Sequence, residues 1–161
     1  MSMTPAKLAK SGTEHGEQVA VFAYAAIARL HGFDVADAWA AEATNLEEVK
    51  RVASHELPEL KWLHAIPNGG SRGDDEKTRA IRGGQMKAEG VRTGVSDISW
   101  PVCRGSYSGL YIEMKKVKGG TVSPEQKEFI AFVQSQGFAA GVCHGWQEAV
   151  NILKMYWNGE L

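Results

Sequence analysis

The segment from Gly94 to Gln126 decides the fold, because it contains three short motifs in close order. The first is Gly94-Val95-Ser96-Asp97-Ile98, the second is Leu110-Tyr111-Ile112-Glu113-Met114-Lys115, and the third is Ser123-Pro124-Glu125-Gln126. Apolar and polar residues alternate in the second motif, which predicts a strand that buries Leu110, Ile112 and Met114. Glu113 and Lys115 then point together from the opposite face, about 7 Å apart along the strand.

A hairpin is predicted between the first and second motifs. Residues 95–102 are also strand-like, and the turn residues Arg104-Gly-Ser-Tyr-Ser-Gly109 separate them from the second motif. Paired antiparallel strands lie about 4.8 Å apart, so this hairpin would bring Asp97 beside Glu113.

Two carboxylates on neighbouring strands, with the ammonium of Lys115 two residues beyond one of them, suit a magnesium-type ion. Such an ion serves phosphodiester hydrolysis, because it offsets the charge of the phosphate and lowers the pKa of a bound water. A lysine at this place can hold or deprotonate that water. The Glu113-Met-Lys115 triplet alone fits an ordinary solvated strand equally well, and its flanking motifs are what favour a site.

Together these motifs resemble the PD-(D/E)xK nuclease superfamily, and within it the small stand-alone form of the VRR-Nuc domain. The stretches that carry the resemblance span most of the chain: Glu14-His-Gly-Glu-Gln18, His64-Ala-Ile-Pro-Asn-Gly-Gly70, Gly90-Val-Arg-Thr-Gly-Val-Ser-Asp97, Glu113-Met-Lys115 and Ser123-Pro-Glu-Gln126. Ser96 stands where the family more often has proline, a residue that shapes the backbone. The resemblance implies an α/β, restriction-endonuclease-like fold with an αβββαβ core, in which a mixed sheet is flanked by helices.

The resemblance also assigns roles to individual residues. The carbonyl of Met114 would be a metal ligand in addition to the two carboxylates, and a glutamate of the first helix would approach the metal. Glu17 is the preferred match for that glutamate, and Glu14 is the alternative. Gln126 would lie near the substrate phosphate or the attacking water, although helix capping explains this residue equally well. The catalytic residues predicted in this way are Asp97, Glu113, Lys115 and Gln126, with Mg²⁺ or Mn²⁺ as the cofactor.

The distribution of charge indicates where nucleic acid would bind. The net charge is −1, which argues against a simple basic protein that coats nucleic acid. Residues 34–59 nevertheless contain seven acidic and two basic residues, whereas residues 77–92 contain five basic residues and one acidic residue. Such asymmetry lets one face meet phosphates, although any single residue of the set also fits a solvated helix face. The predicted contacts to nucleic acid are Lys77, Arg79, Arg82, Lys87, Arg92, Lys116 and Lys118.

Length and composition favour one domain without a membrane anchor. The 161 residues suffice for one hydrophobic core, so we expect a tail over residues 1–12 and a single domain over residues 13–161. No apolar run reaches the length of a membrane span, and the first residues lack the apolar centre of a secretory signal. Cys103 and Cys143 are expected to be reduced core thiols. These features favour a cytoplasmic protein, and the resemblance implies a phage or bacterial setting.

The first half of the chain predicts helices and one strand. A helix should run from near Glu14 to a stop at Gly32, and residues 34–55 should form one or two further helices that cover the core or pack in a dimer. Residues 60–66 read as a strand in which His64 has no catalytic role, and residues 74–89 read as a helix that bends or breaks at Gly83-Gly84. The apolar face predicted for the first helix consists of Val19, Phe22, Ala23, Ala26, Ile27 and Leu30.

The second half completes the order of the core. Pro101 should leave the Asp97 strand bulged or at an edge. Ser123 to Gln136 should form a helix with a capping box, which buries Phe129, Ile130, Phe132 and Val133. A strand over residues 138–143 and a helix over residues 146–157 follow. The order is therefore helix, strand, hairpin, helix, strand, helix.

The resemblance, together with these patterns, implies a homodimeric DNA endonuclease that acts on branched DNA, with four-way junctions as the favoured substrate, because small stand-alone members of the family are similar to junction resolvases. Two copies of a single-site nuclease related by a two-fold axis could make paired cuts in a junction of similar symmetry. An exonuclease fits the same residues. A non-cleaving protein that binds nucleic acid or assembles on this fold is the alternative of a different class. Such a protein would be expected to lack Asp97, Glu113 or Lys115, and all three are present.

Overall fold

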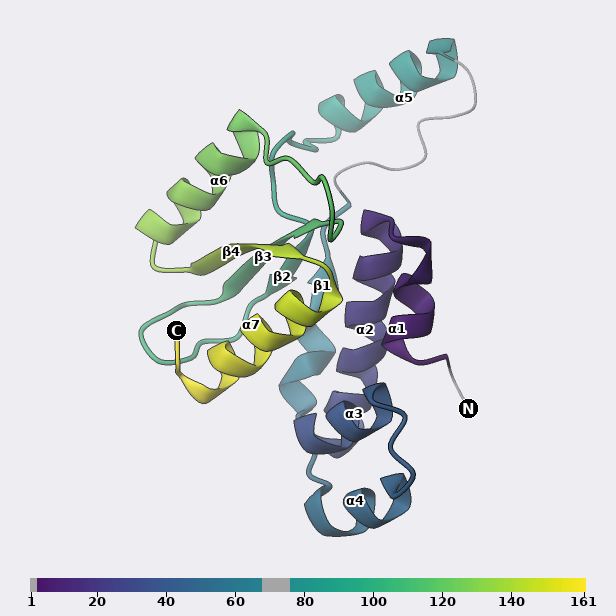
Figure 1. The fold of residues 1–161 in the computed structure, drawn as a ribbon. Coiled ribbons are helices and arrows are strands. Elements are labelled where there is room, and N and C mark those ends of the chain that lie inside the picture. Colours follow the sequence, from purple (N-terminus) through teal and green to yellow (C-terminus); the bar gives the residue numbers. More distant parts are fainter. Residues whose placement is uncertain (1–2, 68–75) are drawn as a thin grey trace.

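A mixed sheet carries the motif that contains Glu113. The computed structural model describes residues 3–67 and 76–161, and within them the sheet has the strands β1 (His64–Ala65), β2 (Ile98–Trp100), β3 (Leu110–Lys115) and β4 (Ala139–His144). They lie side by side in this order, with β1–β2 and β2–β3 antiparallel and β3–β4 parallel. The predicted hairpin and the mixed sheet are therefore confirmed (Figure 1).

Helices cover both faces of this sheet. The helices α2 (Glu14–His31) and α7 (Trp146–Asn158) pack against each other and against β3, where Leu110, Ile112 and Met114 join the hydrophobic core. Helix α6 (Pro124–Ser135) packs against β4, and the ring of its Phe129 meets Tyr111 edge-on at 5.4 Å between centroids. Because Tyr111 alternates with the core residues of β3, α6 lies on the other face of the sheet, as Figure 1 shows.

The remaining helices lie before β2 in the chain. Residues 5–11 differ from the expected tail: they form short helices that pack on α2, and Pro5 is buried. Two helices occupy the 34–55 region, as predicted. The elements are α1 (Pro5–Leu8), η1 (Ala9–Ser11), α3 (Phe33–Ala40), α4 (Leu46–Ala53), η2 (Pro58–Trp62) and α5 (Glu76–Ala88). No helix in the described part of the chain is long and apolar enough to cross a bilayer.

The apolar face predicted for α2 is wrong in part. The helix has the expected bounds, with the Thr13 side chain accepting the Gly16 N–H at its start and Gly32 at its end. Val19 and Leu30, however, are exposed. Phe22 and Ile27 do pack against the core, but the fully buried face consists mainly of small residues, which allow neighbouring elements to approach closely, together with Tyr24 and Glu17. The buried residues are Gly16, Glu17, Ala20, Val21, Tyr24, Ala25 and Ala28.

The strand predicted over residues 60–66 is wrong in its first half. Pro58 begins a 3-10 helix that ends at Trp62, and β1 contains two residues. Leu57, Leu60 and Leu63 are buried at intervals of three, the spacing of a 3-10 turn, while Trp62 is 60% exposed. In this segment the core therefore buries every third residue, and not every second residue as the predicted strand would require.

Helix α5 runs without a break through Gly83 and Gly84, so the bend expected there is wrong. A side chain at either glycine would meet no atom within 4 Å, which leaves the backbone free to stay helical. Figure 1 shows α5 projecting from the body of the protein. The low helix propensity of glycine therefore weakens this helix without bending it.

Three smaller expectations also need correction. Strand β2 lies between β1 and β3, so it is not an edge strand. It ends at Trp100, so Pro101 terminates the strand rather than causing a bulge within it. In α6 the capping box is present, but Phe132 is exposed because the helix faces the sheet through Val133. Cys143 is buried as expected, whereas Cys103 is exposed in the hairpin turn, and both are free thiols.

The backbone of Gly94 lies against the backbone of Glu125 in the Ser123-Pro124-Glu125-Gln126 motif, and a substitution at Gly94 tests this packing. At a φ of +89°, a Cβ on Gly94 would lie 2.6 Å from the carbonyl of Glu125, whereas Gly90, at +93°, has open space. Alanine at either position should cost about 1–3 kcal/mol for the left-handed backbone. Gly94→Ala should cost about 1–3 kcal/mol more for the overlap. Urea unfolding measures both variants, and equal losses would contradict this packing.

Candidate active site

Glu113 and Lys115 form a buried ion pair on the α6 side of β3. The Lys115 Nζ donates a hydrogen bond to the Glu113 Oε1 at 2.6 Å, and the two residues are 4% and 1% exposed. An ordinary solvated strand is therefore excluded. Removing a carboxylate and an ammonium from water costs several kcal/mol each, which their mutual attraction only partly offsets. Such a pair indicates a functional site more strongly than a stabilising contact.

Asp97 lies beside this pair, immediately before β2. The register pairs Ile98 with Ile112, so the next position along the hairpin places Asp97 next to Glu113. The Asp97 Oδ2 accepts the backbone N–H of Met114 at 2.8 Å, which fixes the carboxylate against β3. The Met114 side chain is buried in the core, so its backbone alone can take part in the site.

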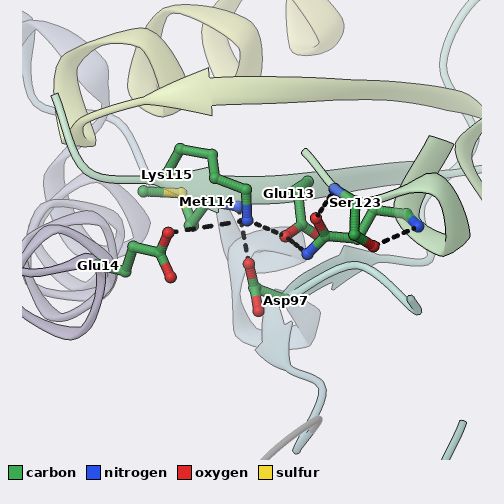
Figure 2. Close-up of polar contacts among 7 residues, drawn as sticks. Glu14, Asp97, Glu113, Met114, Lys115 and Ser123 are labelled. Atoms are coloured by element: carbon green, nitrogen blue, oxygen red, sulfur yellow. Dashed lines mark hydrogen bonds and ion pairs between the residues drawn. The ribbon is translucent and has the colours of Figure 1, made fainter. Parts of the chain in front are cut away.

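Gln126 joins the third motif to Glu113. Its Oε1 accepts the Ser123 N–H at 2.9 Å, and its N–H donates to the Ser123 Oγ at 3.2 Å, which completes the capping box of α6. The Nε2 of the same side chain donates to the Glu113 Oε1 (Figure 2). The two readings of Gln126 are therefore compatible, because one amide group both caps the helix and contacts the site.

The structure brings Glu14, and not the preferred Glu17, to this cluster. The Glu14 Oε1 lies 3.7 Å from the Lys115 Nζ, and its side chain is about half exposed (Figure 2). Glu17, one turn further along α2, is 3% exposed, and its Oε2 accepts the backbone N–H of Trp146 at 2.9 Å. The position of Glu14 matches the role that the resemblance gives to a glutamate of the first helix.

The surroundings shift the protonation of both members of the pair. Burial raises the pKa of Glu113 to about 7, with the charge of Asp97 acting in the same direction and Lys115 opposing it. For Lys115, burial lowers the pKa, but the carboxylates of Glu113, Glu14 and Asp97 outweigh this effect, and the net shift is upward. Lys115 therefore stays protonated at neutral pH, while Glu113 lacks enough compensating positive charge.

The arrangement fits a divalent cation. The Glu113 Oε2 is buried and has no hydrogen-bond partner among the described residues, whereas its Oε1 is held by Lys115 and Gln126. A cation at Oε2 would satisfy this oxygen and reverse the upward pKa shift. Across residues 3–67 and 76–161, no group of three His, Cys, Asp or Glu side chains is placed to hold a metal ion. Asp97, Glu113 and a backbone oxygen such as that of Met114 are the candidate ligands.

The predicted basic residues flank the site in the chain. Lys87, in the last turn of α5, and Arg92, between α5 and Asp97, are exposed, as are Lys116 and Lys118 in the turn after β3. Lys77, Arg79 and Arg82 belong to α5, but their side chains fall outside those that the structure describes.

Sequence reasoning missed the role of Gly120. A Cβ at this position would lie 2.8 Å from the Cβ of Lys115, so the turn that contains Lys116 and Lys118 folds back against the Lys115 side chain. The Gly119-Gly120 pair was the available signal, since adjacent glycines often mark a close backbone approach.

Comparisons with known proteins identify the family and the fold. The family model described as the VRR-NUC domain matches residues 48–147, which is more than half of the chain. The matched segment contains all four strands described above and Gln126, while Glu14 and Glu17 precede it.

A solved structure titled "VRR_NUC domain protein" is similar, with a TM-score of 0.58 and 23% identity over 91% of this chain and 88% of that chain. At this identity the match shows the fold, and it confirms the restriction-endonuclease-like α/β architecture. No curated protein matches the chain.

Glu113 makes stability depend on pH when metal is absent. Its pKa is about 7 in the folded state and close to its ordinary value of 4.5 in the unfolded state. Between these values the folded state keeps a proton that the unfolded state has released, so stability should fall as the pH rises from about 4.5 to about 7. Glu113→Gln cannot ionise and should lack this contribution. Urea unfolding in a chelator measures both proteins, and parallel pH profiles would contradict the shift.

Proposed function

We propose that this chain, which belongs to the VRR-NUC domain family of nucleases, is a metal-dependent DNA endonuclease that acts at the site of Asp97, Glu113 and Lys115. The observation that carries the proposal is the buried Oε2 of Glu113, which has no hydrogen-bond partner within residues 3–67 and 76–161 and lies next to a second carboxylate that the backbone of β3 holds in place. Carboxylate oxygens are the ligands that Mg²⁺ and Mn²⁺ prefer. A bound ion would neutralise phosphate charge and lower the pKa of a water.

Asp97, Glu113 and Lys115 each have a separate role in the proposed reaction. Asp97 is oriented by the Met114 N–H, and Glu113 keeps one oxygen for the ion while the other is held by Lys115 and Gln126. The raised pKa of Lys115 favours a role as a hydrogen-bond donor to the attacking water or the phosphate rather than as a proton acceptor. The negative charge that develops on the phosphate is stabilised by this ammonium.

The exposed basic residues support DNA as the substrate. Lys116 and Lys118 directly follow Lys115 in the chain, and Lys87 and Arg92 precede Asp97, so both basic segments lead into the site. Contacts of this kind bind the phosphate backbone without regard to sequence. Free thiols at Cys103 and Cys143 fit a reducing cytoplasm, in the phage or bacterial setting that the resemblance suggests.

We further propose that the active form is a homodimer that cuts branched DNA, with four-way junctions preferred over linear duplex. Two helices in the segment from Asp34 to His55 extend the domain, and the second of them, α4, buries none of its residues. Val52 of α4 is 72% exposed and Trp62 of η2 is 60% exposed. Apolar residues of this kind supply part of what a self-complementary surface needs.

Substitutions that remove a charge should separate metal binding from turnover. Asp97→Asn and Glu113→Gln should each lose Mn²⁺ affinity by calorimetry and lower kcat on the order of 100-fold or more. Lys115→Ala should keep the metal and lose kcat to a similar extent. Lys127→Ala, which removes an exposed lysine of α6, is the matched control and should behave as wild type. Unchanged Mn²⁺ affinity in both carboxylate variants would sink the assignment of the ligands.

Oligomeric state and substrate choice test the second proposal. Light scattering over a concentration series should give twice the mass of the chain, and a panel of linear, flapped, forked and four-way DNA should show fastest cleavage of the four-way junction. Val52→Asp should shift the equilibrium toward the monomer, because it places a charge on the exposed face of α4. A monomer that degrades linear duplex as readily as a junction would rule the proposal out.

A further inference from the structure

Glu17 is a buried carboxylate that the proposed chemistry does not use. It lies on the inner face of α2, and its Oε2 accepts the N–H of Trp146, the first residue of α7, 129 positions away in the chain. Gly145 at the N-cap of α7 carries no side chain, and the Glu148 carboxylate in the first turn of α7 accepts the N–H of His144 rather than that of Trp146. A carboxylate at this end satisfies a free N–H and favours the helix dipole, so Glu17 caps α7 from a distant helix.

The corner that Glu17 caps is joined to the backbone of Lys115. The Gly145 N–H donates to the Lys115 carbonyl oxygen at 2.9 Å, one step beyond the last paired residues of β3 and β4. Gly145 has a φ of +91°, and a Cβ there would lie 2.7 Å from Val117 and 3.5 Å from the Glu17 Oε2. The corner is therefore packed between Glu17 and the residues that follow Lys115.

Two glutamates of α2 thus act on Lys115 in different ways. Glu14 approaches the ammonium directly, whereas Glu17 reaches the backbone through Trp146 and Gly145. We propose that Glu17 is a positioning residue for Lys115: by capping α7 it fixes the β4–α7 corner, and the corner fixes the end of β3 so that the Lys115 Nζ stays on Glu113. This inference rests on the proposed nuclease function for its consequence in turnover.

Glu17 cannot serve as a metal ligand through Oε2 without giving up this contact. Leaving the Trp146 N–H would expose the start of α7 as an uncapped end and free the corner beside Lys115. Turnover is expected to depend strongly on the position of the Lys115 ammonium, since a misplacement of about 1 Å at a reacting group can cost about 100-fold in rate. A ligand role and a positioning role therefore predict different behaviour for the amide variant.

The test compares Glu17→Ala with Glu17→Gln, which keeps an oxygen that can accept the Trp146 N–H. Glu17→Ala should lower kcat by about 10- to 100-fold with little change in KM, and Glu17→Gln should restore most of that loss. Both variants should bind Mn²⁺ by calorimetry as wild type does. If Glu17→Gln loses Mn²⁺ affinity and turnover as fully as Glu17→Ala, Glu17 is a ligand and the inference is overturned.

A second pair of variants changes the hydrogen-bond donor, the Trp146 N–H, and leaves Glu17 in place. This pair tests the inference even if Glu17→Ala fails to fold. Proline is tolerated at the first helical position and lacks the N–H, so Trp146→Pro removes the contact, while Trp146→Ala removes the ring and keeps the N–H. Turnover should be about tenfold or more lower in Trp146→Pro than in Trp146→Ala, and Glu17→Gln should add nothing further in the proline background. Equal turnover in the two Trp146 variants would overturn the inference.

Hydrogen exchange separates this inference from the nuclease proposal. Protection of the Gly145 amide reports on its bond to the Lys115 carbonyl whether or not the protein cleaves DNA. Glu17→Ala and Trp146→Pro should each lower that protection relative to Glu17→Gln and Trp146→Ala, with Val142 in β4 as an internal reference. Lost protection in a protein that never cleaves DNA would refute the nuclease proposal alone. Unchanged protection would refute the positioning role alone.

Discussion

The burial of Glu113 beside Lys115 on β3 is the constraint on which the site depends. Neither charge is stable away from water unless neighbouring groups compensate for it. Lys115 and Gln126 hold one oxygen of Glu113, Glu14 approaches the ammonium, and the other oxygen of Glu113 remains without a partner in the described part of the chain. The protein thus keeps a carboxylate whose pKa is raised to about 7 in its interior. Under the proposed function, a bound cation would supply the missing positive charge.

Elements from distant parts of the chain converge on this pair. The hairpin supplies Asp97, the capped start of α6 supplies Gln126, and α2 supplies Glu14. Backbone contacts set the orientation of two of these side chains, because Asp97 accepts the Met114 N–H and Gln126 closes a capping box. The same polar contacts that form the fold locally therefore place the reactive groups, and little rearrangement is needed before chemistry.

Local patterns predicted the parts of the fold that local forces determine. Alternation predicted the core face of β3, and Ser123 with Gln126 predicted the start of α6, because pleating and capping act over a few residues. The buried faces of α2 and α6 were harder to predict: Val19 and Phe132 are exposed, and Tyr24 and Glu17 are buried, through contacts with elements far away in sequence. Spacing and resemblance predicted that Asp97, Glu113, Lys115 and Gln126 lie together, and the structure brings them together. Glu14 and Glu17 meet different partners because of the way α2 packs. Residue spacing in the sequence carries no information about that packing.

The central claim is that Glu113 and Asp97 hold a divalent ion on the α6 side of β3. Its most direct test is a crystal structure of the protein soaked in Mn²⁺, with anomalous diffraction used to locate the metal. The account predicts one strong anomalous peak within about 2.0–2.3 Å of the Glu113 Oε2 and of an Asp97 carboxylate oxygen, the range of oxygen–metal bonds for ions of this size. A saturated crystal in which the Glu113 Oε2 has no metal within bonding distance would contradict it.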